Sequence, residues 1–377
     1  MPPPRLRPPA PCLLLAASLL LASATPATPA SAARQKPVSA PVPAAAASLQ
    51  NTLRLGAGIN VFSRYGYLSI SMRVVPRNDS DGGWLFREPT VDVFTPDSLV
   101  AAPQPPLAAG PGRGPQPVFQ GDFHMEFCDN LKQLMQAYFR DFSVERLERP
   151  WRAFSGGWSR ASLSRHLGIA STFASGAAQH CYVLVRVARH RRRAALAQGA
   201  PLTLLDAVRH EADKVVPGDT ASVVNFVRSF GSHYVAAYVT GNSLYQVFVF
   251  TPQIYRRIKQ LLKTQGVSDF SNEELSNYFS PWYAEHIGAI QSASGNATVE
   301  AWAADNLRQH FYFLAYSSLL KLHGNAPLLR RLDGLLREEA LLQLDLRTLA
   351  PAFQDAARRQ WFLEVVDNYL KLWEVNM

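Results

Sequence analysis

The chain has 377 residues, of which 47% are hydrophobic and 18% charged, and its formal net charge is +9. This composition is too apolar for an intrinsically disordered protein, and the length excludes a disulfide-stapled mini-domain. Three cysteines exclude a cysteine-rich extracellular scaffold and a multi-cysteine zinc module. The length is enough for one large or two modest domains.

The first 24 residues have the three parts of a secretory signal peptide. Arg5 and Arg7 form a positive region, residues 12–21 are an apolar run, and residues 22–24 read Ala-Ser-Ala, a small-residue cleavage site. The run has about half the ~20 residues of a membrane span, which favours cleavage over anchoring. We therefore expect a secreted, extracellular protein. Residues 25–50 are rich in Ala, Pro and Ser and predict a flexible segment.

Secretion gives two cysteines and two sequons a specific meaning. Loss of the signal removes Cys12 and leaves Cys128 and Cys181, which we expect to pair in an oxidising compartment. The bridge would close a loop of about 50 residues, and the alternative is two buried free thiols. The sequons at Asn78 and Asn296 are candidate glycosylation sites.

The first part of the body mixes strand and helix patterns. Residues 60–75 are rich in β-branched and aromatic residues and predict extended structure, and residues 96–121 predict a Pro/Gly-rich loop. Apolar residues from Phe127 to Tyr138 recur at helical spacing. Residues 182–187 predict a strand, and residues 202–215 predict a helix.

Residues 233–250 predict one unusually long strand. They are rich in Val, Tyr and Phe and carry no charge after His233. Typical strands have about five or six residues, and Gly241-Asn242 in the middle allows a bend or bulge, so one long strand bent at its centre is expected. Downstream patterns predict a short strand at 298–302 and apolar helical stripes at 254–262, 328–336 and 362–373.

The residues at the head of this strand resemble a family signature. Phe230-Gly231-Ser232-His233-Tyr234 is similar to the aromatic-Gly-Thr-His-aromatic string of the membrane attack complex/perforin (MACPF) family. Ser232 keeps the hydroxyl of the usual threonine, whereas Val223 stands where the family has an upstream aromatic residue. Residues 55–60 look like the family's opening glycine segment, and Gly241-Asn242 stands in place of a glycine pair.

The resemblance implies an α+β fold with a bent four-stranded antiparallel sheet, inserted helical clusters and a helical C-terminal segment. The MACPF domain would cover residues 51–345, with a C-terminal helical extension at 346–377. The inserted clusters would lie at about 127–178 and 251–295. In pore-forming members of the family these clusters unfurl into membrane-spanning hairpins of a ring, so homo-oligomers are among the implied partners.

The layout of a signal peptide and one MACPF domain with few cysteines is similar to that of secreted arthropod members of the family. This resemblance implies a developmental role in embryonic terminal patterning, upstream of a receptor tyrosine kinase. The implied partners are the extracellular ligand or receptor components, together with the plasma membrane or the egg-covering matrix. The alternative is a pore-forming defence or toxin protein.

Ser232 beside His233 invites comparison with a nucleophile and its base. Adjacent residues of a strand point to opposite faces, so we expect no hydrogen bond between the two side chains and no catalytic role. No G-x-S-x-G elbow surrounds Ser232, although a secreted hydrolase is kept as a third hypothesis. The histidines and cysteines lack metal-binding spacing, so no metal or other cofactor is expected.

A run of basic residues lies after the strand predicted at 182–187. We expect this run to form a patch for anionic lipid head groups, glycans or an acidic partner, and the alternative is an ordinary solvated face. Nucleic acid is not expected as the partner of a secreted chain. The residues of the patch are Arg186, Arg189, Arg191, Arg192 and Arg193.

Overall fold

The structure is a computed structural model that describes most of the chain from residue 53 onward. The predicted signal peptide, the flexible segment, the sequon at Asn78 and most of the Pro/Gly-rich loop lie outside the described residues. The described ranges are 53–62, 91–103, 119, 121–155, 158–176, 180–199, 201–265 and 270–376.

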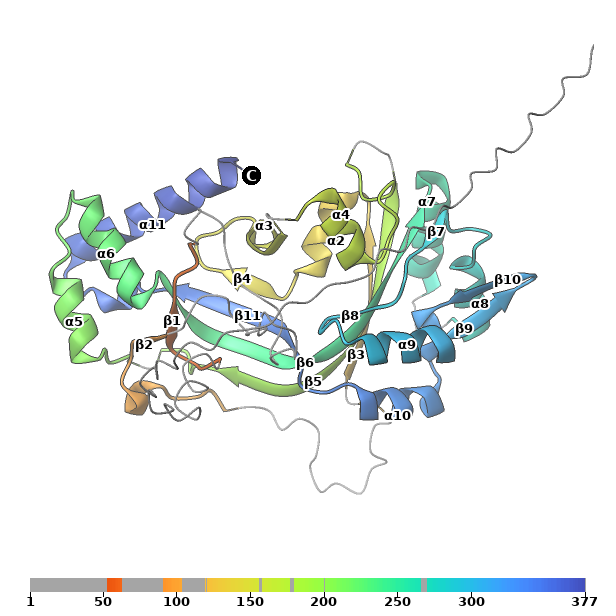
Figure 1. Cartoon of the computed structure of the whole chain (residues 1–377), viewed down its shortest axis with the longest axis horizontal. Helices are drawn as coiled ribbons and strands as arrows, with labels where there is room; N and C mark the ends of the chain where they lie inside the picture. The colour runs from red at the N-terminus through yellow and green to blue at the C-terminus, as the bar shows by residue number, and fades with distance from the viewer. Residues whose placement is uncertain are drawn as a thin grey trace, which may run out of the picture. The chain divides into compact units, whose positions relative to one another are not determined.

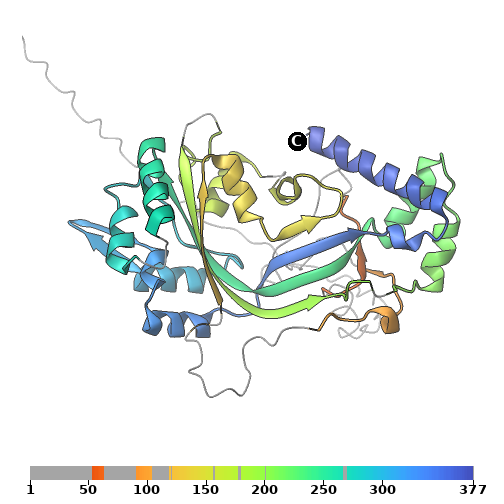
Figure 2. The ribbon, with the colours of Figure 1, turned by 180° about the vertical axis from the view of Figure 1, so that it is seen from behind.

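Four long strands form the centre of the sheet in the described residues. They are arranged in the order β3-β5-β6-β11, and each neighbouring pair is antiparallel. Figures 1 and 2 show β5 and β6 curving together along their length. The expected α+β fold with a bent antiparallel sheet is therefore confirmed. The strands are β3 (Gly121–Cys128), β5 (Cys181–Ala195), β6 (His233–Phe250) and β11 (Ala340–Thr348).

Strand β6 is the central strand of this sheet and pairs with five other strands in the described residues. It has the 18 residues predicted from the sequence, and β5 pairs with it over almost its whole length. β1 continues the β5 edge at His233 and Tyr234, whereas the other edge is shared by β11 along the first half and β8 and β7 along the second. A further strand, β4, pairs in parallel with β11, and β2 pairs with β1. These strands are β1 (Ala57–Ile59), β2 (Val91–Asp92), β4 (Phe142–Val144), β7 (His286–Ile287) and β8 (Gln291–Ser292).

Helices fill the connections between the long strands. The insert between β3 and β5 carries β4, α2 (Leu131–Tyr138), α3 (Pro150–Ser155) and α4 (Arg160–Leu167). Helices α5 (Asp206–Asp213) and α6 (Thr220–Phe230) connect β5 to β6, and α11 (Ala356–Asn376) ends the chain. The insert between β6 and β11 carries β7, β8, α7 (Pro252–Gln265), α8 (Asn272–Tyr278), α9 (Ala297–Asn306), the hairpin β9 (Arg308–Phe311)–β10 (Leu314–Ser317), and α10 (Ala326–Leu335).

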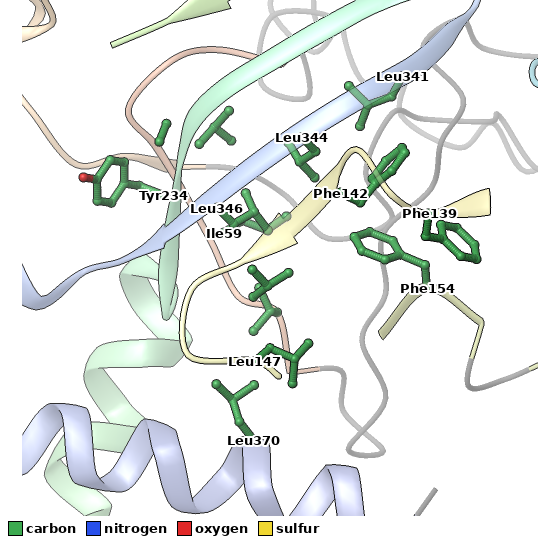
Figure 3. Packing of buried hydrophobic residues seen from close by; sticks show 14 of the residues in the cluster. Ile59, Phe139, Phe142, Leu147, Phe154, Tyr234, Leu341, Leu344, Leu346 and Leu370 are labelled. Atoms are coloured by element: carbon green, nitrogen blue, oxygen red, sulfur yellow. The ribbon is translucent and has the colours of Figure 1, made fainter. Parts of the chain in front are cut away.

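The two faces of the sheet are both buried, under different helices. Tyr182 and Leu184 of β5 face a cluster formed with the first insert, α6, β11 and α11. Val183 and Val185 face the opposite cluster, which is formed with α7, α8, α9 and α10. Because side chains alternate along a strand, the apolar run of β5 supplies both clusters at once. Figure 3 shows part of the first cluster, where Phe142, Leu147, Leu344, Leu346 and Leu370 lie close together.

Several elements differ from the sequence-based expectations. The predicted strand at 298–302 is wrong, because the Asn296 side chain accepts hydrogen bonds from the backbone N–H groups of Thr298 and Val299 and starts α9 there. The helix predicted from Phe127 begins only at Leu131, after the Asn130 cap, and the residues before it form β3.

The C-terminal boundary predicted at residue 345 falls inside β11. This strand was missed in the sequence, and it lies between β6 and β4 in the sheet. Helix α11 adds four buried side chains to the first cluster, namely Phe362, Val365, Val366 and Leu370. Strand β11 and helix α11 therefore pack in the same core as the long strands of the sheet.

A matched pair of leucines on α11 tests this packing. Leu370 is 1% exposed and Leu372 is 60% exposed. We expect Leu370→Ala to lower the free energy of unfolding by about 2–5 kcal/mol, because it leaves a cavity in the core. Leu372→Ala should change it by less than about 0.5 kcal/mol. Urea denaturation followed by circular dichroism measures both values, and equal effects would mean that α11 does not belong to the core.

Candidate functional site

The signature residues form a tight corner between α6 and β6. Helix α6 ends at Phe230 and is capped by Gly231, whose φ of 92° lies in a region that favours glycine. A Cβ at this position would lie 2.5–2.7 Å from the backbone of Ile59 in β1. Gly231 thus lets the chain turn directly against β1, and Ser232 continues this contact by donating its N–H to the Ile59 carbonyl oxygen at 3.0 Å.

Ser232 connects three segments that are far apart in the sequence. Its Oγ accepts a hydrogen bond from the backbone N–H of Val61 at 3.3 Å. Its carbonyl oxygen accepts from the N–H of Leu349, just after β11, at 3.0 Å. The side chain is 0% exposed, so each of these polar groups has its partner inside the protein.

His233 extends the corner to the end of β4. Its Nε2 lies 3.2 Å from the carbonyl oxygen of Glu145, and its Nδ1 lies 2.9 Å from the Ser232 Oγ. A carbonyl oxygen can only accept, so Nε2 carries the proton and the Ser232 hydroxyl donates to Nδ1. The Glu145 carboxylate in turn accepts hydrogen bonds from the N–H and the hydroxyl of Thr348 in β11. The corner therefore joins β1, β4, β6 and β11.

The expectation that Ser232 and His233 do not hydrogen-bond is wrong. Opposite faces apply to residues within a pleated strand, whereas β6 begins at His233 and Ser232 still belongs to the turn made by Gly231. The pair is nevertheless fully buried, and its polar atoms are engaged with backbone groups. Burial lowers the pKa of His233 to about 4, and the hydrogen bond to the Glu145 carbonyl opposes part of that shift.

Sequence reasoning could not identify Glu145 as a member of this corner. It lies 88 residues before His233 and contributes a backbone carbonyl, which any residue type could supply. Aromatic side chains of the signature and of α6 pack around the corner. Phe226 packs against Phe230, Phe353 and Phe362 below the corner, and Tyr234 makes an edge contact with Phe94.

Gly241 and Asn242 lie at an irregular point of the sheet. A Cβ on Gly241 would lie 1.9 Å from the Arg189 carbonyl oxygen, and the β5–β6 register shifts at the same place, between His190 and Arg192. The buried Asn242 amide donates to the Ser294 hydroxyl at 2.9 Å and accepts from the Ser243 N–H at 2.9 Å. At this point the backbones of β5 and β6 approach closely, and the Asn242 side chain is held by hydrogen bonds.

The predicted disulfide between Cys128 and Cys181 is wrong, because both are free, buried thiols. Cys128 pairs with Tyr182 across the β3–β5 ladder, so it shares a face with Tyr182 and not with Cys181. The two sulfurs accordingly belong to the opposite hydrophobic clusters. Burial raises the pKa of Cys128 to about 12 and also raises the pKa of Cys181.

The five arginines do not form the single basic patch that was expected. The basic run lies within β5, so its side chains alternate between faces. Arg186 pairs with Asp141, whereas the buried Arg189 pairs with Asp333 at 2.6 Å. The other three arginines are exposed: Arg191 donates to the carbonyl oxygens of Asp333 and Leu336 at the end of α10, Arg192 pairs with Glu338 at 3.3 Å, and Arg193 follows it.

Asn296 already has a structural role in the described chain. Its Oδ1 caps α9, and its Nδ2 donates to the Glu339 carboxylate at 3.0 Å. Its glycosylation stays a prediction. The described residues hold no group of three His, Cys, Asp or Glu side chains placed to bind a metal ion.

Comparisons with known proteins give remote structural similarity only. No protein-family model and no curated protein match the chain. The similar solved structures include GNIP1Aa from Chromobacterium piscinae, with 12% identity and a TM-score of 0.41, covering 86% of this chain and 56% of that one. A cell invasion protein with a MAC/Perforin domain from Bacteroides thetaiotaomicron has 11% identity and a TM-score of 0.37, covering 83% and 59%.

Astrotactin-2, described as a perforin-like membrane protein involved in neuronal development, has 12% identity and a TM-score of 0.32, covering 84% of this chain and 45% of that one. The chain thus spans between 45% and 59% of the length of these three proteins. At such scores whole-chain similarity decides nothing about function.

The buried His233 predicts a pH dependence of stability. The unfolded chain binds a proton at this histidine below about pH 6.5, whereas the folded chain does so only near pH 4. The free energy of unfolding should therefore fall by up to about 3 kcal/mol as the pH is lowered through this window. In His233→Gln this part of the pH dependence should disappear, while the exposed control His310→Gln should retain it. Urea unfolding at several pH values measures the difference, and identical profiles for wild type and His233→Gln would contradict the assignment.

The free thiols predict that reduction does not affect stability. Dithiothreitol should leave the unfolding temperature unchanged, because no bond between Cys128 and Cys181 is present to break. Loss of a disulfide that closes a loop of this length would cost about 4 kcal/mol. Alkylation of the denatured, unreduced chain followed by mass spectrometry should modify both cysteines. If the two cysteines are alkylated only after reduction, the protein contains the disulfide and this prediction is wrong.

Proposed function

We propose that this chain is a secreted, non-catalytic MACPF protein that acts through contacts outside the cell. The observation that carries the proposal is the position of residues 230–234. They form the corner at the head of the longest strand of a bent antiparallel sheet, and helical inserts lie between β3 and β5 and between β6 and β11. This combination of motif, strand order and inserts agrees with what the MACPF resemblance implies.

Within this family the proposed role is that of Torso-like, a secreted arthropod protein. The chain would act in embryonic terminal patterning by locally enabling the activation of a receptor tyrosine kinase, through the release, processing or accumulation of its ligand. The N-terminal signal pattern supports an extracellular site of action. The proposed partners are ligand or receptor components, with the plasma membrane or egg-covering matrix as the supporting surface.

The geometry of the corner supports a non-catalytic role. A serine nucleophile must reach its substrate, whereas Ser232 and His233 are both 0% exposed. The Ser232 hydroxyl is held between His233 and the Val61 N–H, and the imidazole proton is directed at a backbone carbonyl. These bonds stabilise the fold and leave neither group directed at a cleft.

The attachment of both inserts favours a contact role over pore formation. In the first insert, β4 pairs with β11, and Ser143 donates to the Asp345 carboxylate at 2.8 Å. In the second insert, β7 and β8 pair with the edge of β6. An ion pair of 2.9 Å between Lys259 and Asp129 joins the two inserts. Unfurling them would break sheet hydrogen bonds as well as helix packing.

A pore-forming role is the second candidate. It is favoured by the location of the inserts, which occupy the segments that become membrane-spanning hairpins in pore-forming MACPF proteins. No described helix has the length and apolar character needed to cross a bilayer.

A reversible lock on the first insert separates the two candidates. Ser143 and Asp345 are partners in the β4–β11 ladder, so cysteines at both positions lie within disulfide range. We expect the oxidised Ser143→Cys/Asp345→Cys protein to activate the receptor of cells that carry the ligand precursor as well as wild type does. Receptor phosphorylation is the readout, and the reduced double variant is the control.

Dye release from liposomes, with electron microscopy for rings, tests the alternative in the same samples. Leakage that the oxidised lock abolishes and reduction restores would establish a pore and contradict the contact role. Absence of any effect of the wild-type protein on receptor phosphorylation would also overturn the proposed function.

A further inference from the structure

The tip of the β9–β10 hairpin exposes three large apolar side chains in a row. The two strands are joined by Tyr312 and Phe313 alone. Tyr312 is 82% exposed, Phe313 is completely exposed, and Leu314 is 59% exposed. Figures 1 and 2 both show this hairpin projecting beyond α8 and α9, at the end of the sheet where the second insert lies. Exposed apolar side chains are common singly, but a consecutive run at a protruding tip is characteristic of a contact surface.

The turn itself does not require aromatic residues. Two-residue hairpin turns favour Asn and Gly, because their backbone adopts positive φ with little strain. Tyr312 has a φ of 52°, a conformation that bulky side chains disfavour. The aromatic pair therefore works against the local backbone preference, and its presence points to a role in contacts beyond the hairpin.

The base of the hairpin is held firmly against the body. The Tyr316 hydroxyl and the Gln309 amide both donate to Ser276 of α8, and Ser317 donates to the Ala304 carbonyl oxygen of α9. Lys321 Nζ donates to the carbonyl oxygen of Arg308 at 2.7 Å. The tip is thus presented on an anchored support.

The hairpin and the residues that follow it carry charges of one sign, and the carboxylates near its base include Glu273 and Glu274 of α8. Residues 306–322 contain no Asp or Glu, while Arg308 and His310 in β9 are exposed. At about 3.3 Å per residue, His310 lies about 7 Å behind Tyr312 and Arg308 about 13 Å behind it. An apolar tip followed by a basic shaft matches the profile of a bilayer, where acyl chains give way to anionic head groups over about 5–10 Å.

We propose that Tyr312, Phe313 and Leu314 insert into the interface of a lipid bilayer, with Arg308 and His310 at the level of the head-group phosphates, where added anionic lipid strengthens the binding. Phe313 supplies apolar surface for this interface, and Tyr312 adds a hydroxyl that can stay at the level of the head groups. The tip protrudes and its three apolar side chains are exposed, so it can enter a lipid bilayer, which needs no preformed pocket to receive it. The inference names the membrane-facing surface of the proposed function, and it rests on that function only for the extracellular location.

The test measures binding of the full chain to vesicles of phosphatidylcholine alone or mixed with phosphatidylserine. We expect binding to the anionic vesicles, and the Phe313→Ser/Leu314→Ser protein should lose about tenfold or more of its partition coefficient, because it forfeits the apolar surface that enters the interface. Leu372→Ser is the matched control, since Leu372 is 60% exposed and Leu314 is 59% exposed, and it should bind as wild type does. Arg308→Gln should weaken binding only to the anionic vesicles.

An environment-sensitive dye on Phe313→Cys should shift to the blue when anionic vesicles are added, whereas the same dye on Leu372→Cys should not. The inference is overturned if wild type does not bind anionic vesicles, or if the double variant binds them as well as wild type. It is also overturned if the double variant loses binding to cells while keeping binding to vesicles, because the tip would then contact a protein. Intact vesicle binding without any effect on receptor phosphorylation supports the inference and contradicts the proposed signalling function.

Discussion

The hydrogen bonds of His233 are the constraint on which the rest of the sheet depends. One ring nitrogen accepts from Ser232, which is bonded to β1 and to the residue after β11, and the other donates to the end of β4. Because the ring is buried and uncharged, each of these partners has to be in place for the chain to avoid an unpaired polar group. The corner thereby fixes the starting register of β6 against β1 on one edge and β11 on the other.

From this fixed start, the alternation of side chains along β5 and β6 organises the whole core. Odd-numbered and even-numbered positions of β5 feed different hydrophobic clusters, and each cluster has its own helices. The sheet is therefore buried on both faces, which is unusual for an antiparallel sheet. The same alternation separates the two cysteines. Together with the register shift between His190 and Arg192, it leaves three of the five arginines exposed, at positions 191–193.

Several local signals in the sequence were sufficient to predict elements of the fold. The long run of Val, Tyr and Phe predicted β6 with its correct ends, and the apolar stripe at 254–262 predicted α7. The signature string placed the corner correctly, although the contact between Ser232 and His233 was not foreseen because it depends on the unusual backbone of Gly231.

Signals that depend on distant partners were missed. The carbonyl of Glu145 has no side-chain signature. Strand β11 is a different case, because residues 342–347 alternate apolar and polar side chains and this local strand signal was overlooked. The run of arginines predicts exposed side chains, yet Arg189 is buried. Its charge is balanced there by Asp333, which lies 144 residues later in the chain. Register between strands decides such cases, and register is a property of the assembled sheet.

The order of the strands along the chain also governs how the protein is made. About 90 residues separate the end of β6 at Phe250 from the start of β11 at Ala340, so one edge of β6 waits for its partner during synthesis. At about 5–20 residues per second the ribosome needs roughly 5–20 s to deliver β11, and α11 comes later still. An open edge of a long apolar strand is a site for aggregation. The edge of β6 that β11 covers is therefore the part of the sheet that stays unpaired longest while the chain is made.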